Sequence, residues 1–138
     1  MTRIAISYVS TGLVFLALDA VWLTVMGRVL YLPALGPMLQ QPFNMAPAVL
    51  FYLIYVAGIV FFAVEPAAQS GQWSTALLRG AVLGFVAYAT YDLTNQATLK
   101  GWPVLVTMAD LAWGTLVTGA SALLGHVLSG VILGWLGR

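Results

Sequence analysis

Residues 4–26 read IAISYVSTGLVFLALDAVWLTVM, an apolar run in which Asp19 is the only charged side chain. As a helix with a rise of about 1.5 Å per residue this run would be roughly 35 Å long, and the hydrocarbon core of a bilayer is about 30 Å thick. The sequence therefore predicts a first membrane-spanning helix over residues 4–26.

The composition of the whole chain agrees with a lipid environment. Of its 138 residues, 62% are hydrophobic and 7% are charged, whereas soluble domains devote about a quarter of their residues to charged side chains. A net charge of +1 argues against a nucleic-acid-binding surface, which needs clustered Lys and Arg. There is no cysteine, which excludes disulfides and thiolate metal sites.

Three further apolar runs cover residues 47–64, 76–99 and 104–136, and they are separated by Pro, Gly and charged residues. We therefore expect the whole chain to form one all-helical integral membrane domain, a bundle of four transmembrane helices. The last run is too long for one perpendicular span. We expect it to tilt, to break near Gly125 or Gly130, or to end at the interface.

The connections between the runs indicate where the chain meets the membrane surface. Residues 27–46 are apolar but carry Pro33, Pro37 and Pro42, so we expect them to lie at the surface without a regular helix. Residues 65–73 are expected to form a short polar turn. A cytoplasmic N-terminus places more positive residues inside the cell than outside, by three to two. The three are Arg3, Arg79 and Arg138, and the two are Arg28 and Lys100.

Three aspartates are predicted to lie inside the membrane at one depth. Asp19 and Asp92 each lie seven residues before the end of a predicted helix, and Asp110 lies six residues after the start of the last one. Because the first and third helices run in the same direction and the fourth returns, all three are about 10 Å below the same surface. The same half of the bilayer holds further candidates, namely Thr94, Asn95, Trp22 and Trp113. The opposite half is expected to be nearly free of polar groups.

An ionised carboxylate at the bilayer centre costs about 2.5–3.5 kcal/mol, so these acids need partners, protonation or water. One interpretation is a hydrated cavity that binds a cation, a proton or a polar headgroup. The other is structural: Asp19 pairs with Arg28, Asp92 pairs with Lys100, and Asp110 caps its helix. Oxygen ligands suit a hard divalent cation, but the same carboxylates also suit a proton. The sequence therefore assigns no metal, and it predicts no cofactor.

Small residues four apart are expected to pack the half of the bundle opposite the acids. Gly80-x-x-x-Gly84 and Gly130-x-x-x-Gly134 would let helix backbones approach closely. The same faces could contact a second copy of the chain or another membrane protein. A repeat that relates the first helix pair to the second would arrange the bundle as two parallel hairpins.

Residues 91–103, YDLTNQATLKGWP, form a mixed polar run that hydrophobic composition does not explain. Together with LDAVWL at 18–23 and DLAWG at 110–114, this run resembles a bacterial family of small predicted membrane proteins, a domain of unknown function. The shared signature is Y-D-L-T-N-x-A-T-L-K-x-W-P, and the resemblance extends over nearly the whole chain. It implies four helices and an inner-membrane location, with no established activity or cofactor, and it hints at a lipid-linked role.

The sequence leaves three functions open, and with them the question of whether the protein is an enzyme. The first is binding or movement of a small cation, a proton or a headgroup by the three aspartates. Their neutral ligands and walls would be Asn95, Thr94, Trp22 and Trp113. The second is a membrane enzyme or enzyme subunit in lipid modification, with one acid as a general base and residues 27–46 admitting the lipid chain. The third is a structural or assembly protein whose acids set helix register. Membrane lipids are the expected partners in each case.

Overall fold

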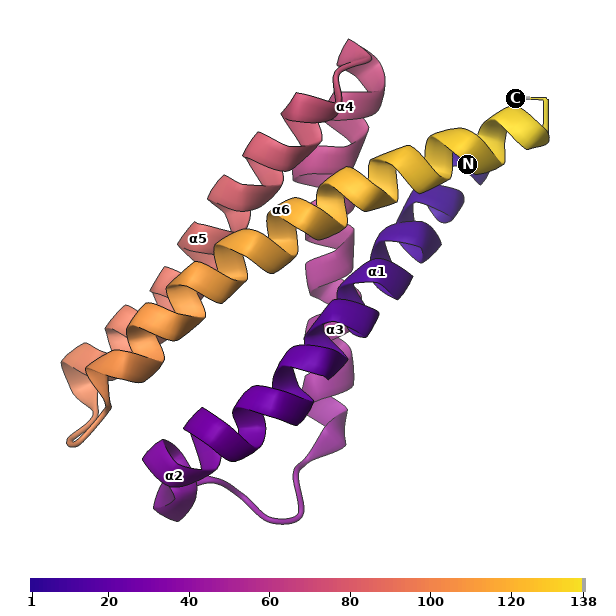
Figure 1. The fold of residues 1–138 in the computed structure, drawn as a ribbon. Helices are drawn as coiled ribbons and strands as arrows, with labels where there is room; N and C mark the ends of the chain where they lie inside the picture. The colour runs from indigo at the N-terminus through magenta and orange to yellow at the C-terminus, as the bar shows by residue number, and fades with distance from the viewer. Residues whose placement is uncertain (138) are drawn as a thin grey trace.

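Four long helical rods make up the protein in the computed structural model, which describes residues 1–137 (Figure 1). The first rod consists of α1 (Thr2–Met26), the π-helical turn η1 (Gly27–Tyr31), α2 (Leu32–Leu35) and the 3-10 turn η2 (Gly36–Met38). The second consists of α3 (Met45–Ile59), the π-helical turn η3 (Val60–Val64) and α4 (Glu65–Ser70). The third and fourth are α5 (Trp73–Thr98) and α6 (Val104–Trp135). Arg138, which enters the charge argument for orientation, lies outside the described residues.

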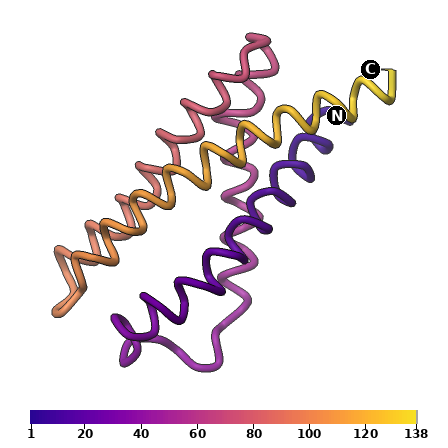
Figure 2. Tube along the Cα trace, viewed as in Figure 1, coloured from indigo at the N-terminus to yellow at the C-terminus, as the bar shows by residue number. Residues whose placement is uncertain are grey.

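The rods define two ends of the bundle. Figure 2 shows the connections at residues 39–44 and 99–103 together at one end. The turn at residues 71–72 lies at the other end with the N-terminus and the end of α6. We call these the Lys100 end and the Glu65 end.

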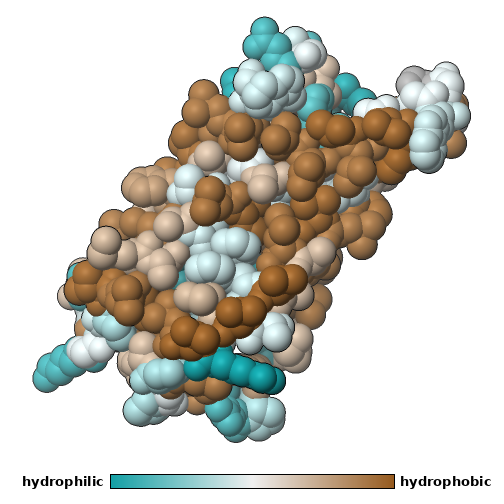
Figure 3. All heavy atoms as spheres, in the orientation of Figure 1, coloured by the Kyte–Doolittle hydropathy of each residue, from teal (hydrophilic) through white to brown (hydrophobic). Residues whose placement is uncertain are grey.

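Three of the four rods are long and apolar enough to cross a membrane, namely Thr2–Met38, Met45–Ser70 and Val104–Trp135. The fourth, α5, has 26 residues but is less apolar, because its second half carries Thr90, Asp92, Thr94 and Asn95. Composition therefore supports three of the four expected spans. On the face shown in Figure 3, apolar residues form most of the middle of the molecule, and the most hydrophilic residues lie toward its two ends.

Two expected breaks in the helices are absent. The α-helix α1 ends at Met26 as predicted, but helical turns continue to Met38 where no regular helix was expected, and residues 65–70 are helical where a polar turn was expected. In both places a π turn precedes a proline. The N–H of Leu32 bonds to Gly27 O just before Pro33, and the N–H of Glu65 bonds to Val60 O just before Pro66.

A proline inside an α-helix lacks an N–H and its ring strikes the carbonyl four residues back. The wider π turn changes this local geometry, and the rod continues past the proline. The last helix also runs without a break, from Val104 to Trp135, past Gly125 and Gly130. In Figure 1 it is clearly inclined relative to α3.

Close backbone contact between α5 and α6 is the main packing interaction of the bundle. A Cβ atom added at Gly80 would overlap Ala122 and the backbone of α6, and one added at Gly84 would overlap the Gly114 carbonyl oxygen. The first predicted glycine motif therefore packs helices. Apart from the backbone of their own helix, no atom of residues 1–137 lies within 4 Å of a Cβ added at Gly130 or Gly134, so the second motif does not pack against another described helix.

A hydrophobic core and an ion pair join the first two rods near the Glu65 end. Phe15, Ile59 and Val64 are fully buried between the helices. Arg3 Nη2 lies 2.5 Å from Glu65 Oε2, which links the start of α1 to the start of α4.

The glycine contacts predict a difference between two similar substitutions. Gly84→Ala should lower the free energy of unfolding by about 1–3 kcal/mol, because its methyl group overpacks the contact with α6. Gly130→Ala meets open space and should be neutral or stabilising by up to about 1 kcal/mol, since Ala favours the helix. Unfolding of both variants in mixed micelles by SDS, followed by circular dichroism, measures the difference. Equal effects would contradict the close packing of α5 on α6.

Candidate functional site

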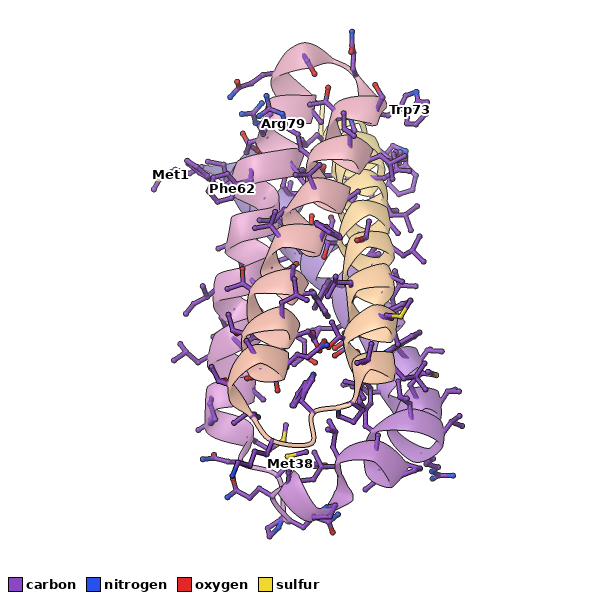
Figure 4. The ribbon with its side chains drawn as sticks, turned by 90° about the vertical axis from the view of Figure 1, so that its left-hand side faces the viewer. Met1, Met38, Phe62, Trp73 and Arg79 are labelled. Carbon is purple, nitrogen blue, oxygen red and sulfur yellow. The ribbon has the colours of Figure 1, made fainter. Side chains whose placement is uncertain are left out.

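The three aspartates are buried inside the bundle. Asp19 on α1 is 7% exposed, Asp92 on α5 is 0% exposed and Asp110 on α6 is 8% exposed. In Figure 4, oxygen atoms gather between the helices in the half nearer Met38, away from Trp73 and Arg79. We call the three acids, with Tyr31, Tyr52, Trp22 and Trp113, the acid cluster.

Asp19 is held by two neutral donors from other rods. Tyr52 on α3 donates its hydroxyl to Asp19 Oδ2 at 2.5 Å, and Trp113 on α6 donates Nε1–H to Asp19 Oδ1 at 3.3 Å. Hydrogen bonds to a charged acceptor are about twice as strong as neutral ones, so both contacts stabilise a carboxylate at this position. Asp19 therefore joins α1, α3 and α6.

Asp110 is held in a similar way from the first rod. The Tyr31 hydroxyl in η1 donates to Asp110 Oδ1, and Trp22 Nε1–H donates to the same hydroxyl at 2.9 Å. The Trp22 and Trp113 rings are stacked, with centroids 4.3 Å apart and planes at 4°. The stacked indoles thus connect the hydrogen bonds around Asp19 with those around Asp110.

Asp92 has no such donor. Both of its carboxyl oxygens are buried, and no group of residues 1–137 donates to them. Its polar neighbour is the Asp110 carboxyl group, which is close enough for a hydrogen bond between the two carboxyl groups. Two ionised carboxylates only accept, so this hydrogen bond exists only if one of the pair carries a proton.

The remaining predicted site residues lie outside the cluster or at its edge. Thr94 is exposed, and its hydroxyl donates to backbone carbonyls of its own helix, including Tyr91 O at 3.0 Å. Asn95 is half-buried, with its side chain beside Tyr91. The structure therefore brings together Trp22, Trp113 and the aspartates, whereas Thr94 and Asn95 donate no hydrogen bond to the carboxyl groups.

The expected ion pairs with Arg28 and Lys100 are not formed. Within residues 1–137 the ion pair is that of Arg3 with Glu65, and both Arg28 and Lys100 are exposed. The Tyr52 hydroxyl takes the place at Asp19 that was expected for Arg28. No donor among the described residues takes the place at Asp92 that was expected for Lys100. In the part of the chain that the structure describes, no group of three or more His, Cys, Asp or Glu side chains is arranged so that it could hold a metal ion.

Neither tyrosine of the cluster was predicted from the sequence, and the reasons differ. Tyr31 was expected in a surface connection, whereas η1 keeps it within the first rod. Tyr52 and Tyr55 carried a signal that could have been used, because residues three apart on an apolar helix share a face. The Tyr55 hydroxyl bonds to Thr118 Oγ1 at 2.8 Å.

The half of the bundle toward the Glu65 end is also more polar inside than expected. Hydroxyl side chains of α1 and α6 are buried there, and we call them the hydroxyl column. Its members are Ser7, Ser10, Thr11, Thr118, Ser121 and Ser129. This burial was not predicted, because Ser and Thr interrupt an apolar run only slightly, and the rotation of each helix decides whether they face lipid or protein.

Residues 4–127 match the family of predicted membrane proteins DUF2177, a domain of unknown function. The chain belongs to this family. The resemblance seen in the sequence is thereby confirmed, and the DUF2177 match agrees with the apolar rods in assigning a membrane protein. A search of curated proteins found no match, and neither did a search of solved structures.

The tyrosine hydrogen bonds predict that loss of the Tyr52 hydroxyl destabilises the protein more than loss of the Tyr8 hydroxyl. Tyr52→Phe removes a donor to the buried Asp19 carboxylate and should lower the free energy of unfolding by about 1.5–3 kcal/mol. Tyr8→Phe is the matched control, since its exposed hydroxyl donates to the Leu53 carbonyl at 3.0 Å. It should lower the free energy by about 1 kcal/mol or less. SDS unfolding in mixed micelles measures both, and a Tyr52→Phe effect no larger than the control would contradict the role assigned to Tyr52.

Proposed function

We propose that this DUF2177 protein crosses the bacterial inner membrane four times and binds and transfers a proton at the acid cluster. The observation that carries the proposal is the Asp92 carboxyl group, fully buried, without a donor and next to Asp110. The neutral partners of Asp19 and Asp110 support it further.

Repulsion between two ionised carboxylates favours a bound proton. Two like unit charges 4 Å apart repel by about 4 kcal/mol at an effective dielectric constant of 20. A proton on one carboxyl group removes this repulsion and supplies the hydrogen bond between them. Asp110 already accepts from Tyr31, whereas Asp92 has no donor, so Asp92 is the group that takes the proton and donates it to Asp110.

A cation or a lipid headgroup is a poorer occupant for this site. The oxygens of Asp19 already accept from Tyr52 and Trp113, and the three acids are no more than 8% exposed. A bare ion or a headgroup would have to displace these donors, whereas a proton needs no added space. In the proposed transfer, the Asp92 carboxylate gains an O–H bond as the incoming donor loses one.

The fourth span is supported by the packing of α5. Although α5 is less apolar than the other rods, it lies along α6, and Gly80 and Gly84 bring the two backbones together. The polar residues in its second half include Asp92, which is turned into the bundle. With four spans and a cytoplasmic N-terminus, the Lys100 end is outside the cell.

The absence of native cysteine makes the topology directly measurable. Single Gln40→Cys and Lys100→Cys variants should react with a membrane-impermeant maleimide on intact spheroplasts. Gln72→Cys should react only after the membrane is opened. Labelling of Gln72→Cys and Lys100→Cys from the same side would contradict a membrane-spanning α5. Reversed labelling of all three would contradict only the orientation.

Infrared spectroscopy of the protein in lipid tests the bound proton. The wild type at neutral pH should show the carbonyl stretch of a neutral carboxylic acid inside the bundle, and Asp92→Asn should remove it. The Asn amide can still donate to Asp110, so a purely structural role of residue 92 would survive this substitution. Glu65→Gln is the control for the fourth acidic residue and should leave the band in place.

Two outcomes would contradict the proposal. A wild-type spectrum without a carboxylic-acid band would mean that the acids are all ionised. A band that persists in Asp92→Asn and disappears in Glu65→Gln would place the proton at the other end of the protein.

A further inference from the structure

The hydroxyl column occupies the interior between the Glu65 end and the acid cluster. On α1, Ser7 and Thr11 are four residues apart with Ser10 between them, and on α6 Thr118 and Ser121 are three residues apart, while Ser129 lies eight residues beyond Ser121. A step of three or four residues advances about 4.5–6 Å along a helix, and the step from Ser121 to Ser129 advances about 12 Å. The two helices are in contact at the middle of the column, because a Cβ atom added at Gly125 would strike Thr11.

Two hydroxyls in the middle of the column have no partner in the protein. They are Thr11 Oγ1 and Ser121 Oγ, and both side chains are 0% exposed. Ser121 lies one helical turn from Gly125, the residue on which Thr11 packs, so the two hydroxyls lie at neighbouring levels. A buried hydroxyl without a hydrogen bond is unfavourable by about 1–3 kcal/mol, and buried water is the usual partner of such a group.

The column has a titratable group at its outer end. Glu65 Oε2 is paired with Arg3, while Glu65 Oε1 is buried without a partner. Arg3 and Ser7 are one helical turn apart on α1, which brings the ion pair next to the first hydroxyl of the column.

At its inner end the column meets the tyrosines of the cluster. Phe15 fills the position between Thr11 and Asp19 on α1 and contacts the rings of Tyr52 and Tyr55. The hydrogen bond between Tyr55 and Thr118 continues the line of polar groups past Phe15. Tyr52 then donates to Asp19.

We propose that protons reach the acid cluster from the Glu65 end through the hydroxyl column, with water bound at Thr11 and Ser121. This inference rests on the proposed proton-binding function. Each hydroxyl or water accepts a proton on its oxygen and gives its own proton to the next group. Glu65 takes one proton from water at its end of the bundle and passes one on, a carboxylate of the cluster gains one, and only O–H bonds form and break.

Hydrogen–deuterium exchange of the cluster tests the route. Wild-type protein in lipid is transferred from H2O to D2O, and time-resolved infrared spectroscopy follows the isotope shift of the carboxylic-acid band. Thr11→Val with Ser121→Ala removes both unpartnered hydroxyls at nearly constant shape. We expect exchange to slow by about tenfold or more, which corresponds to about 1.4 kcal/mol added to the barrier.

The control pair is Thr24→Val with Thr90→Val. Both of these threonines are exposed, and each hydroxyl bonds to a carbonyl of its own helix at 2.7 Å. In this double variant the carboxylic-acid band should exchange at the wild-type rate. Thr11→Ser keeps the hydroxyl and should also exchange at the wild-type rate, which separates the hydroxyl from the packing of residue 11.

The outcomes separate the route from the function. If the Thr11→Val, Ser121→Ala protein keeps the band and exchanges as fast as the wild type, protons enter from the Lys100 end and the column is not the route. If Thr11→Ser slows exchange as much as the double variant, packing and not the hydroxyl is responsible, and the route is again wrong. If the wild type has no carboxylic-acid band, the proton-binding function itself fails and the route has no endpoint.

Discussion

A carboxyl group buried inside a helical bundle must find its hydrogen bonds within the protein, because an unpaired buried polar group is costly. In this DUF2177 protein that constraint connects helices that are far apart in sequence. Asp19 accepts hydrogen bonds from a tyrosine of α3 and a tryptophan of α6, and Asp110 accepts one from a tyrosine of the first rod. The acids thus fix which faces of the helices meet, and Asp92 is left with another acid as its neighbour.

The prolines affect the same site indirectly. Pro33 would ordinarily end or kink a helix near residue 29, and the π turn η1 lets the rod continue to the residues that follow. Tyr31 is in this turn, and its hydroxyl reaches Asp110 across the bundle. A π turn also carries the second rod past Pro66, so that Glu65 remains helical beside Arg3. Such turns occur often at functional sites, and here one of them supplies a donor to the acid cluster.

Apolar run length and helix rise were enough to predict the long helices and that the aspartates lie in the same half of the bundle. They could not predict what the acids contact, because that depends on the rotation of each helix about its axis. Arg28 and Lys100 were natural partners by sequence distance, yet both are exposed, a tyrosine bonds to Asp19, and Asp92 is left without a donor among the described residues. The π turns were also hidden, since a proline in a sequence is read as a break. The buried hydroxyls of α1 and α6 became visible only once the two helices were packed together.

The central claim is that the acid cluster holds a proton at neutral pH. Asp19, Asp92 and Asp110 are the only aspartates in the chain, so isotope labelling of aspartate side-chain carboxyl carbons reports on the cluster alone. Magic-angle-spinning 13C NMR of the labelled protein in lipid measures the state of each carboxyl group. The account predicts at least one resonance at the position of a neutral carboxylic acid, and its loss in Asp92→Asn. Resonances at the carboxylate position for all of the aspartates at neutral pH would contradict it.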